Sequence, residues 1–209
     1  AAMKSPYPEA LDYIKTHESL EWHGLGRFIL SIYDEPLSFP ISRCLDTPDD
    51  DAVALILRCA EYFMANGENE GLRIIGRAVI LREPFLYRLA EAGGDGKKDF
   101  QEFPPANVDD PLDLEQVFDG PPIIGNIPSS CPYSEVLSFL GKHSVAAQSY
   151  RLAKFILSLF DWSGAFSFRE CVAGNETDID KMVMPSLEYY VEHGRDTNLY
   201  LIYTAILVR

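Results

Sequence analysis

Residues 27–34 read RFILSIYD and residues 154–161 read KFILSLFD, so one short stretch occurs twice in a chain of 209 residues. A shift of 127 residues extends this match without a gap, and fifteen positions are identical over residues 27–82. Ordinary composition gives roughly four identities by chance over that length. The chain is therefore predicted to contain two copies of one structural unit, because self-similarity at a fixed spacing is the signature of repeat folds.

The similarity continues upstream of the quoted stretch. After a slip of one residue, a shift of 126 aligns residues 6–17 with residues 132–143. We expect the slip to lie in a turn between two helices. The predicted organisation is a single domain, 1–209, with three parts: repeat unit one (6–82), a connector (83–131) and repeat unit two (132–209).

The quoted stretch is predicted to be helical. Its apolar residues are spaced three and four positions apart, which places them on one face of an α-helix, and the second copy repeats the pattern. They are Leu25, Phe28, Ile29, Ile32 and Tyr33 in the first copy, and Leu152, Phe155, Ile156, Leu159 and Phe160 in the second. We interpret Phe28, Phe155, Cys44 and Cys171 as core residues, because phenylalanine and cysteine are among the residue types most often buried.

The next long helix of each copy has recognisable ends. In the first copy Thr47 is expected to cap it, and the acidic run at residues 49–51 faces the positive end of the helix dipole. Gly67 and Gly194 are expected to follow the equivalent helices in a left-handed conformation. In the second copy Pro185 must kink or restart the helix, because proline lacks a backbone donor and clashes with the preceding turn.

Each unit is predicted to contain four helices arranged as two antiparallel hairpins, and a further helix is expected from Pro84 to Ala92. A lone unit would expose an apolar face, and docking the two units would bury it. The fold class is therefore expected to be all-α, a tandem duplication of a roughly four-helix unit with about nine helices in total. The units are predicted to pack either as a short α-solenoid or as two half-bundles, joined by a proline-rich acidic connector.

The composition excludes several classes of partner. A net charge of −14 argues against binding nucleic acid or an anionic membrane surface. No run of 18 or more apolar residues is present, so no membrane span is expected. The four cysteines form no CxxC pair, which indicates reduced thiols and a cytoplasmic location. The acidity suits either solubility alone or a basic protein partner attracted by electrostatic steering.

The connector carries half of the net charge, with ten acidic and three basic residues. Apolar residues are spread through it, so it is expected to be ordered. An acidic patch in it is predicted to bind the basic partner. This patch consists of Asp109, Asp110, Asp113, Glu115 and Asp119. The alternative is a structural strap that fills the junction between the two units.

No catalytic constellation is recognisable. Phosphate-loop, GxSxG and HExxH patterns are absent and the histidines lack metal-ligand spacing, so no catalytic residue, cofactor or metal is expected. His17 and His143 are predicted at helix C-terminal ends, where a protonated imidazole complements the helix dipole. Asp34 and Asp161, which end the quoted stretches, are interpreted as turn residues. The alternative is a paired general base or metal ligand.

The expected function is that of an acidic cytoplasmic protein-binding module. An immunity protein or inhibitor that neutralises a basic toxin or enzyme has this size, charge and lack of motifs, an analogy that rests on physical properties alone. One alternative is a hydrolase whose acidic residues converge between the two repeat units, and another is a structural scaffold protein. A cleft with Asp34 and Asp161 facing each other favours the hydrolase, and a broad acidic face around residues 109–119 favours binding.

Overall fold

The computed structural model describes residues 2–33, 39–91, 126–143, 147–160, 166–172 and 177–207. Every regular element in these ranges is an α-helix, which confirms the all-α fold class. The first group of helices is α1 (Tyr7–Thr16), α2 (Ser19–Tyr33), α3 (Ile41–Leu45), α4 (Asp50–Asn66), α5 (Glu70–Arg82) and α6 (Pro84–Glu91). The second group is α9 (Pro132–Lys142), α10 (Ala147–Leu159), α11 (Phe168–Val172), α12 (Thr177–His193) and α13 (Thr197–Leu207).

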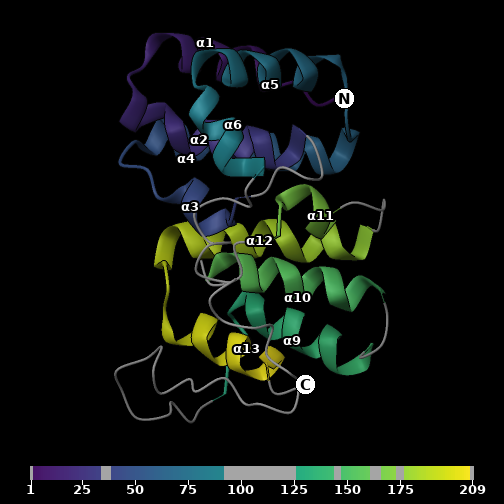
Figure 1. Cartoon of the computed structure of the whole chain (residues 1–209). Helices are drawn as coiled ribbons and strands as arrows, with labels where there is room; N and C mark the ends of the chain where they lie inside the picture. The colour runs from purple at the N-terminus through teal and green to yellow at the C-terminus, as the bar shows by residue number, and fades with distance from the viewer. Residues whose placement is uncertain are drawn as a thin grey trace.

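The two groups form two tiers, one stacked on the other (Figure 1). Positions 127 apart in the sequence, or 126 apart in α1 and α9, are called equivalent from here on. α3 and α11 begin and end at equivalent positions, and so do α4 and α12. The prediction of four helices per unit is wrong, because each tier contains α3 or α11 in addition. These two helices have only five residues, too few to show an apolar periodicity, and the described ranges hold eleven helices instead of about nine.

The ends of α4 correct one prediction and confirm another. Asp49 caps α4 in place of Thr47, because its Oδ1 accepts a hydrogen bond from the backbone N–H of Asp51 at 3.0 Å. Asp49 is better placed than Thr47 because it directly precedes the first helical residue. Gly67 follows α4 with φ of 65°, and Gly194 follows α12 with φ of 61°. Both glycines have the positive φ that was predicted at the helix ends.

Two predictions about proline residues have different outcomes. α12 runs through Pro185 as one helix, so of the two predicted outcomes, a kink or a restart, the restart is wrong and the kink stays a prediction. Pro185 is exposed, whereas Ser186 and Leu187 after it are buried, so the chain beyond the proline stays packed on the core. The helix predicted from Pro84 is confirmed as α6, which ends at Glu91.

One hydrophobic core extends through both tiers. Phe28 is 1% exposed, and Phe155, Cys44 and Cys171 are 0% exposed, which confirms that these four residues belong to the core. Phe28 in α2 lies against Phe168 in α11, with ring centroids 5.2 Å apart, so the core is continuous across the boundary between the tiers. The equivalent apolar stripes of α2 and α10 are therefore both turned inward.

Each tier contains the same pair of tyrosines packed edge to face. The ring centroids of Tyr7 and Tyr62 are 5.2 Å apart, and those of Tyr133 and Tyr189 are 5.1 Å apart. In each tier the residue that caps α5 or α13 also forms a hydrogen bond with the hydroxyl of the second tyrosine. The identities at these positions are thus explained by packing and capping.

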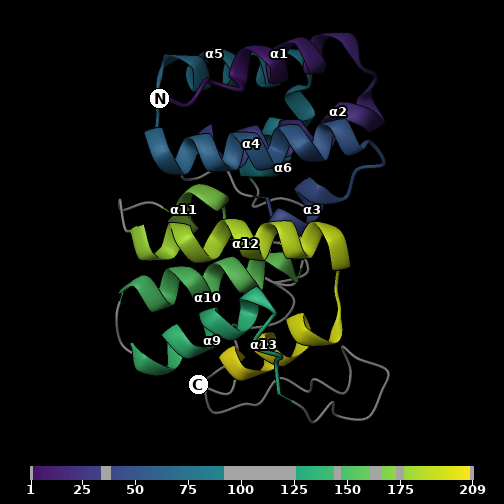
Figure 2. The same cartoon turned by 180° about the vertical axis from the view of Figure 1, so that it is seen from behind.

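Among the described helices, three pairs pack closely across the boundary between the tiers. α4 packs on α12, α2 packs on α11 and α3 packs on α10, and Figure 2 shows α4 and α12 side by side. Exchanging each helix for its equivalent leaves the first pair unchanged and interconverts the other two. The backbone N–H of Ile41 in α3 donates to Ser158 Oγ in α10 at 2.9 Å, so the boundary also contains a buried hydrogen bond.

Candidate functional site

The acidic residues predicted to bind a partner are not among those that the structure describes. Asp109, Asp110, Asp113, Glu115 and Asp119 lie outside the described ranges. Asp34 and Asp161, considered above as turn residues or as a catalytic pair, lie outside them too. These predictions therefore stay predictions.

His17 and His143 are confirmed at the C-terminal ends of helices, where each is the residue that follows α1 or α9. The imidazole of His17 stacks on Tyr13 with ring centroids 3.7 Å apart. Its Nδ1 lies 2.9 Å from the backbone carbonyl oxygen of Tyr13. His143 packs on Phe139, the residue equivalent to Tyr13, at 4.5 Å. Both imidazoles are held by a local aromatic contact and cover the end of their own helix.

A groove lies between α1 and α4, and it is called the acidic groove from here on. Its volume is about 430 Å³. The acidic and basic side chains in its lining are Glu9, Asp12, Asp51 and Arg58, and the imidazole of His17 lies beside them. Arg58 is tied to Glu9, with Nη1 2.7 Å from Oε2. Because this pair neutralises the one guanidinium in the lining, Asp12 and Asp51 leave the groove with an excess of negative charge.

The equivalent groove lies between α9 and α12 and is called the mixed groove. Its volume is about 320 Å³. Its lining holds two carboxylates and two ammonium groups, from Glu135, Asp178, Lys142 and Lys181. Lys181 is equivalent to Ala54 of the acidic groove, and Lys142 is equivalent to Thr16. The two tiers therefore present the same hollow with a different charge.

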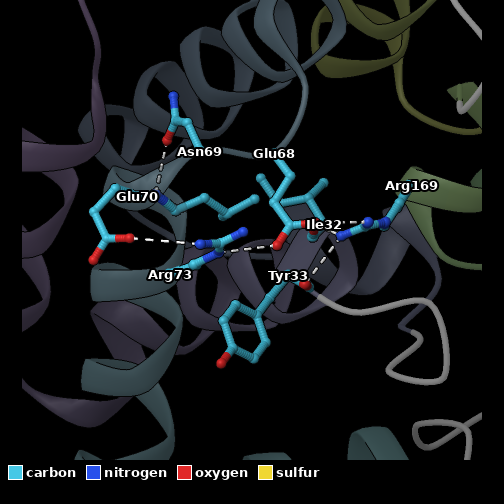
Figure 3. Close-up of polar contacts among 8 residues, drawn as sticks. Ile32, Tyr33, Glu68, Asn69, Glu70, Arg73 and Arg169 are labelled. Atoms are coloured by element: carbon cyan, nitrogen blue, oxygen red, sulfur yellow. Dashed lines mark hydrogen bonds and ion pairs between the residues drawn. The ribbon is translucent and has the colours of Figure 1, made fainter.

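On one side of the boundary between the tiers, Arg169 of α11 forms a network of polar contacts (Figure 3). Its Nη1 donates to the backbone carbonyl oxygens of Ile32 and Tyr33, at 3.3 and 3.1 Å, and so caps the end of α2. Its Nη2 lies 3.0 Å from Oε2 of Glu68, in the turn between α4 and α5. Arg73 donates to the other oxygen of Glu68 at 3.2 Å. Hydrogen bonds from Arg169, which has the larger effect, and from Arg73 hold the pKa of Glu68 below its usual value.

The equivalent place on the other side of the boundary is an open pocket, called the junction pocket. Ser42 takes the position of Arg169, and Arg195 takes the position of Glu68. Both residues line the pocket, which has a volume of about 450 Å³. A large base and an acid have thus been replaced by a small hydroxyl and a base.

The cysteines do not form a reactive site. All four are buried free thiols. Burial raises the pKa of Cys44 and of Cys59 to about 12, and it also raises the pKa values of Cys131 and Cys171. A thiol with so high a pKa stays protonated at neutral pH and is a weak nucleophile. Within the described ranges, no three His, Cys, Asp or Glu side chains are grouped so that they could hold a metal ion.

The junction pocket and the Arg169 network were not predicted from the sequence. One signal was present, because a shift of 127 aligns Arg169 with Ser42 and Glu68 with Arg195. The pair of Arg169 and Glu68 carries opposite charges, whereas the aligned pair of Ser42 and Arg195 has one neutral residue and one base. Such a difference indicates that the two tiers present different surfaces at these positions. The sequence does not show that the four residues lie at the boundary between the tiers.

No protein-family model, no curated protein and no solved structure matches the chain. In the part of the chain that the structure describes, no helix is both long enough and apolar enough to cross a membrane.

Proposed function

We propose that this protein is a binding module for a basic protein partner, built from two copies of one helical unit packed as half-bundles. The observation that supports the proposal is the difference between the two grooves. They lie between equivalent helices, yet one has an excess of carboxylates and the other has balanced charges. An acidic surface selected only for solubility has no reason to be concentrated in one of two equivalent hollows.

The acidic groove suits a cationic segment for a physical reason. A hollow lined by one sign of charge concentrates the field, and it raises the rate at which an oppositely charged partner arrives. Asp49 and Asp50 extend the negative surface at the start of α4, beside Asp51. A hydrogen bond from the hydroxyl of Tyr13 holds the pKa of Asp49 below its usual value, so this carboxylate stays ionised at neutral pH.

The acidic connector belongs to the same proposal. Its patch of Asp109, Asp110, Asp113, Glu115 and Asp119 adds five carboxylates to the binding surface. A module that uses such a surface to neutralise a basic toxin or enzyme acts as an immunity protein or inhibitor. The four free cysteines suit a cytoplasmic protein, because disulfides are rare in that compartment.

The test compares the grooves with a lysine-rich peptide as the probe. Asp12→Asn with Asp51→Asn removes two charges from the acidic groove, and Glu135→Gln with Asp178→Asn removes two from the mixed groove. We expect the first double variant to bind the peptide about tenfold more weakly at low ionic strength, and the second to bind as the wild type does. Fluorescence anisotropy at low and at physiological ionic strength measures both, and the salt dependence should be flatter in the first variant.

The matched control separates a site from a general effect of net charge. Both double variants gain two units of charge, and both lose one aspartate from the first turn of a long helix, Asp51 or Asp178. Equal losses in the two variants would show that only the total charge matters, and the proposal would fail. Asp109→Asn, Asp110→Asn and Asp113→Asn together, in the same assay, measure what the connector contributes.

A further inference from the structure

The outer side of α5 carries large apolar side chains that are exposed to solvent. Ile74 is 52% exposed and Leu81 is 81% exposed. They are seven positions apart, which places both on the same side of the helix. α5 packs on α1, α2 and α6, and it lies with α1 at the end of the molecule that is farthest from the second tier (Figure 1). This side of α5 is therefore turned away from the boundary between the tiers.

α1 lies beside α5 and runs in the same direction. At their starts, a Cβ added at Gly71 would lie 3.1 Å from the ring of Tyr7. At their ends, Nη2 of Arg82 donates to the backbone carbonyl oxygen of His17 at 2.7 Å. The two helices therefore present one continuous surface to solvent.

The side of α1 nearer to α5 adds one apolar residue and one base to this surface. The acidic groove takes the other side of α1, at Glu9, Asp12 and Thr16. Leu11 and Lys15 lie away from those positions, because successive helical residues are turned by about 100°. Leu11 is partly buried against the core, and Lys15 is exposed.

The surface also contains Arg77, which is exposed on α5. It is called the α1–α5 face from here on, and it consists of Leu11, Lys15, Ile74, Arg77 and Leu81. Neither Lys15 nor Arg77 forms a hydrogen bond or an ion pair with another described residue. In a chain with a net charge of −14, two unpaired bases beside an apolar strip form a local exception.

The second tier keeps the apolar positions of this face and lacks its bases. Two of the apolar positions are matched by Leu137 and Leu201, whereas the two bases are matched by Gly141 and Thr204. Leu201 is half-buried. The packing that the tiers share therefore does not require the positive charge, which belongs to the first tier alone.

We propose that the α1–α5 face binds an amphipathic helix of a partner protein, with an apolar stripe toward α5 and acidic residues along its edges. Apolar side chains three and four positions apart on that helix cover Leu11, Ile74 and Leu81, which is a common mode of helix recognition. Its carboxylates pair with Lys15 and Arg77, because oppositely charged hydrogen-bonded groups bind strongly. An anionic membrane would also suit bases beside apolar residues, but a net charge of −14 opposes it. The proposal does not rest on the acidic groove or on its basic partner.

The experiment uses the full chain and three fluorescent synthetic peptides of about 14 residues, long enough to span α5 as helices. The first has leucines three and four positions apart, with glutamates beside them. The second has the same residues in an order without this spacing, and the third has glutamine in place of glutamate. We expect fluorescence anisotropy to show that the first binds at least tenfold more tightly than the others.

An affinity for the first peptide that does not exceed both other affinities would overturn the proposal. The chain is also mixed with vesicles of phosphatidylserine and phosphatidylcholine, and no binding is expected. Binding to these vesicles without binding of the first peptide would assign the face to a membrane and would likewise overturn the proposal.

The first variant tests the apolar strip. Ile74→Gln with Leu81→Gln removes two exposed apolar side chains and keeps residues that favour a helix. We expect it to bind the first peptide about tenfold more weakly. The control is Tyr150→Gln, which removes a side chain that is 61% exposed in the second tier and should bind as the wild type does. Undiminished binding by the double variant would place the peptide elsewhere and overturn the proposal.

The second variant tests the bases and still decides if the first one unfolds. Lys15→Gln with Arg77→Gln should weaken binding about fivefold at low ionic strength and flatten its dependence on salt. The matched control, Lys142→Gln with Lys181→Gln, removes two positive charges from the mixed groove and should bind as the wild type does. Equal losses in the two variants would show that only the total charge matters, and the proposal would be overturned.

Discussion

Phe28 and Phe155 occupy equivalent positions and are both fully buried, whereas Arg169 and Ser42, also equivalent, differ in size, charge and contacts. The first pair lies on the apolar stripes that hold each tier together, and the second pair lies on the two sides of the boundary between the tiers. The tiers thus agree where a closely packed interior leaves little freedom of volume. They differ where a change of side chain can open a pocket or reverse a charge.

The largest expected effect tests the agreement between the cores. Phe28→Ala and Phe155→Ala should each lower the free energy of unfolding by about 3–5 kcal/mol, because each removes a buried aromatic ring and leaves a cavity. Urea denaturation of the two variants measures both values. A loss below roughly 1 kcal/mol in one variant only would show that the two tiers do not share the core in the same way.

How much of the fold and of the candidate site could be predicted depended on whether the residues that interact are close together in the sequence. The apolar spacing around Phe28 and Phe155 is local, so the sequence predicted both helices and their buried faces. Five-residue helices such as α3 and α11 carry too few apolar positions to be recognised, and the cap at Asp49 was assigned two residues too early. Arg169 and Glu68 are 101 positions apart, and nothing local indicates their contact. The acidic connector lies outside the described ranges, so that part of the candidate site remains a prediction.

A smaller effect is expected at a difference within the core. In the first tier Gly76 of α5 lies against the ring of Tyr33, and an added Cβ would meet that ring at 2.1 Å. The equivalent residues, Tyr203 and Phe160, stack with ring centroids 4.1 Å apart. Gly76→Ala should lower the free energy of unfolding by about 1–3 kcal/mol through overpacking, although alanine ordinarily stabilises a helix interior relative to glycine.

The background variant Tyr33→Ala tests the cause of that loss. Without the ring, Gly76→Ala should stabilise the protein by about 0.5–1 kcal/mol, the ordinary helix-propensity effect. Thermal or urea unfolding of the four proteins in this cycle gives both values. The same loss in both backgrounds would assign the effect to the backbone and would remove Tyr33 from the explanation.

The next effect compares the two sides of the boundary. Arg169→Met should cost about 1–2 kcal/mol at neutral pH, because it leaves the end of α2 uncapped and Glu68 without its closest base, and both side chains are partly exposed. Ser42→Ala, at the position equivalent to Arg169, should change the free energy of unfolding by less than about 0.5 kcal/mol, because the Ser42 hydroxyl has no hydrogen-bond partner among the described residues. Urea unfolding of both variants measures the difference. Equal losses in the free energy of unfolding would show that the two sides of the boundary contribute equally to stability.

The Arg169 network also has a dependence on pH that can be worked out. The pKa of Glu68 is lower in the folded protein than its ordinary value of 4.5, so the folded state binds fewer protons than the unfolded state in this range. Its contribution to stability is present above the unfolded value and is lost as the pH falls through the folded value. The loss in free energy of unfolding caused by Arg169→Met should therefore be smaller at acid pH than at pH 7. An equal loss at both pH values would show that the effect of Arg169 does not act through Glu68.

The smallest expected effect concerns His23 in α2, whose equivalent, Tyr150, is 61% exposed. Burial, assisted by Arg27 and Arg82 and opposed by Glu83, lowers the pKa of His23 from its ordinary value of 6.5. Between the two values the unfolded state binds the proton and the folded state does not. Stability contributed by the neutral imidazole is therefore present above pH 6.5 and decreases as the pH falls below it.

His23→Gln should flatten this part of the pH profile, with a smaller change in the free energy of unfolding than Arg169→Met causes at pH 7. The matched control is Tyr150→His, which places an imidazole at the exposed equivalent position. It should add no slope, because an exposed imidazole has nearly the same pKa in the folded and the unfolded chain. Urea midpoints measured between pH 5 and pH 8 give the slopes. A profile unchanged by His23→Gln would assign the slope to another group, and a new slope in Tyr150→His would show that the two tiers bury this face of the helix alike.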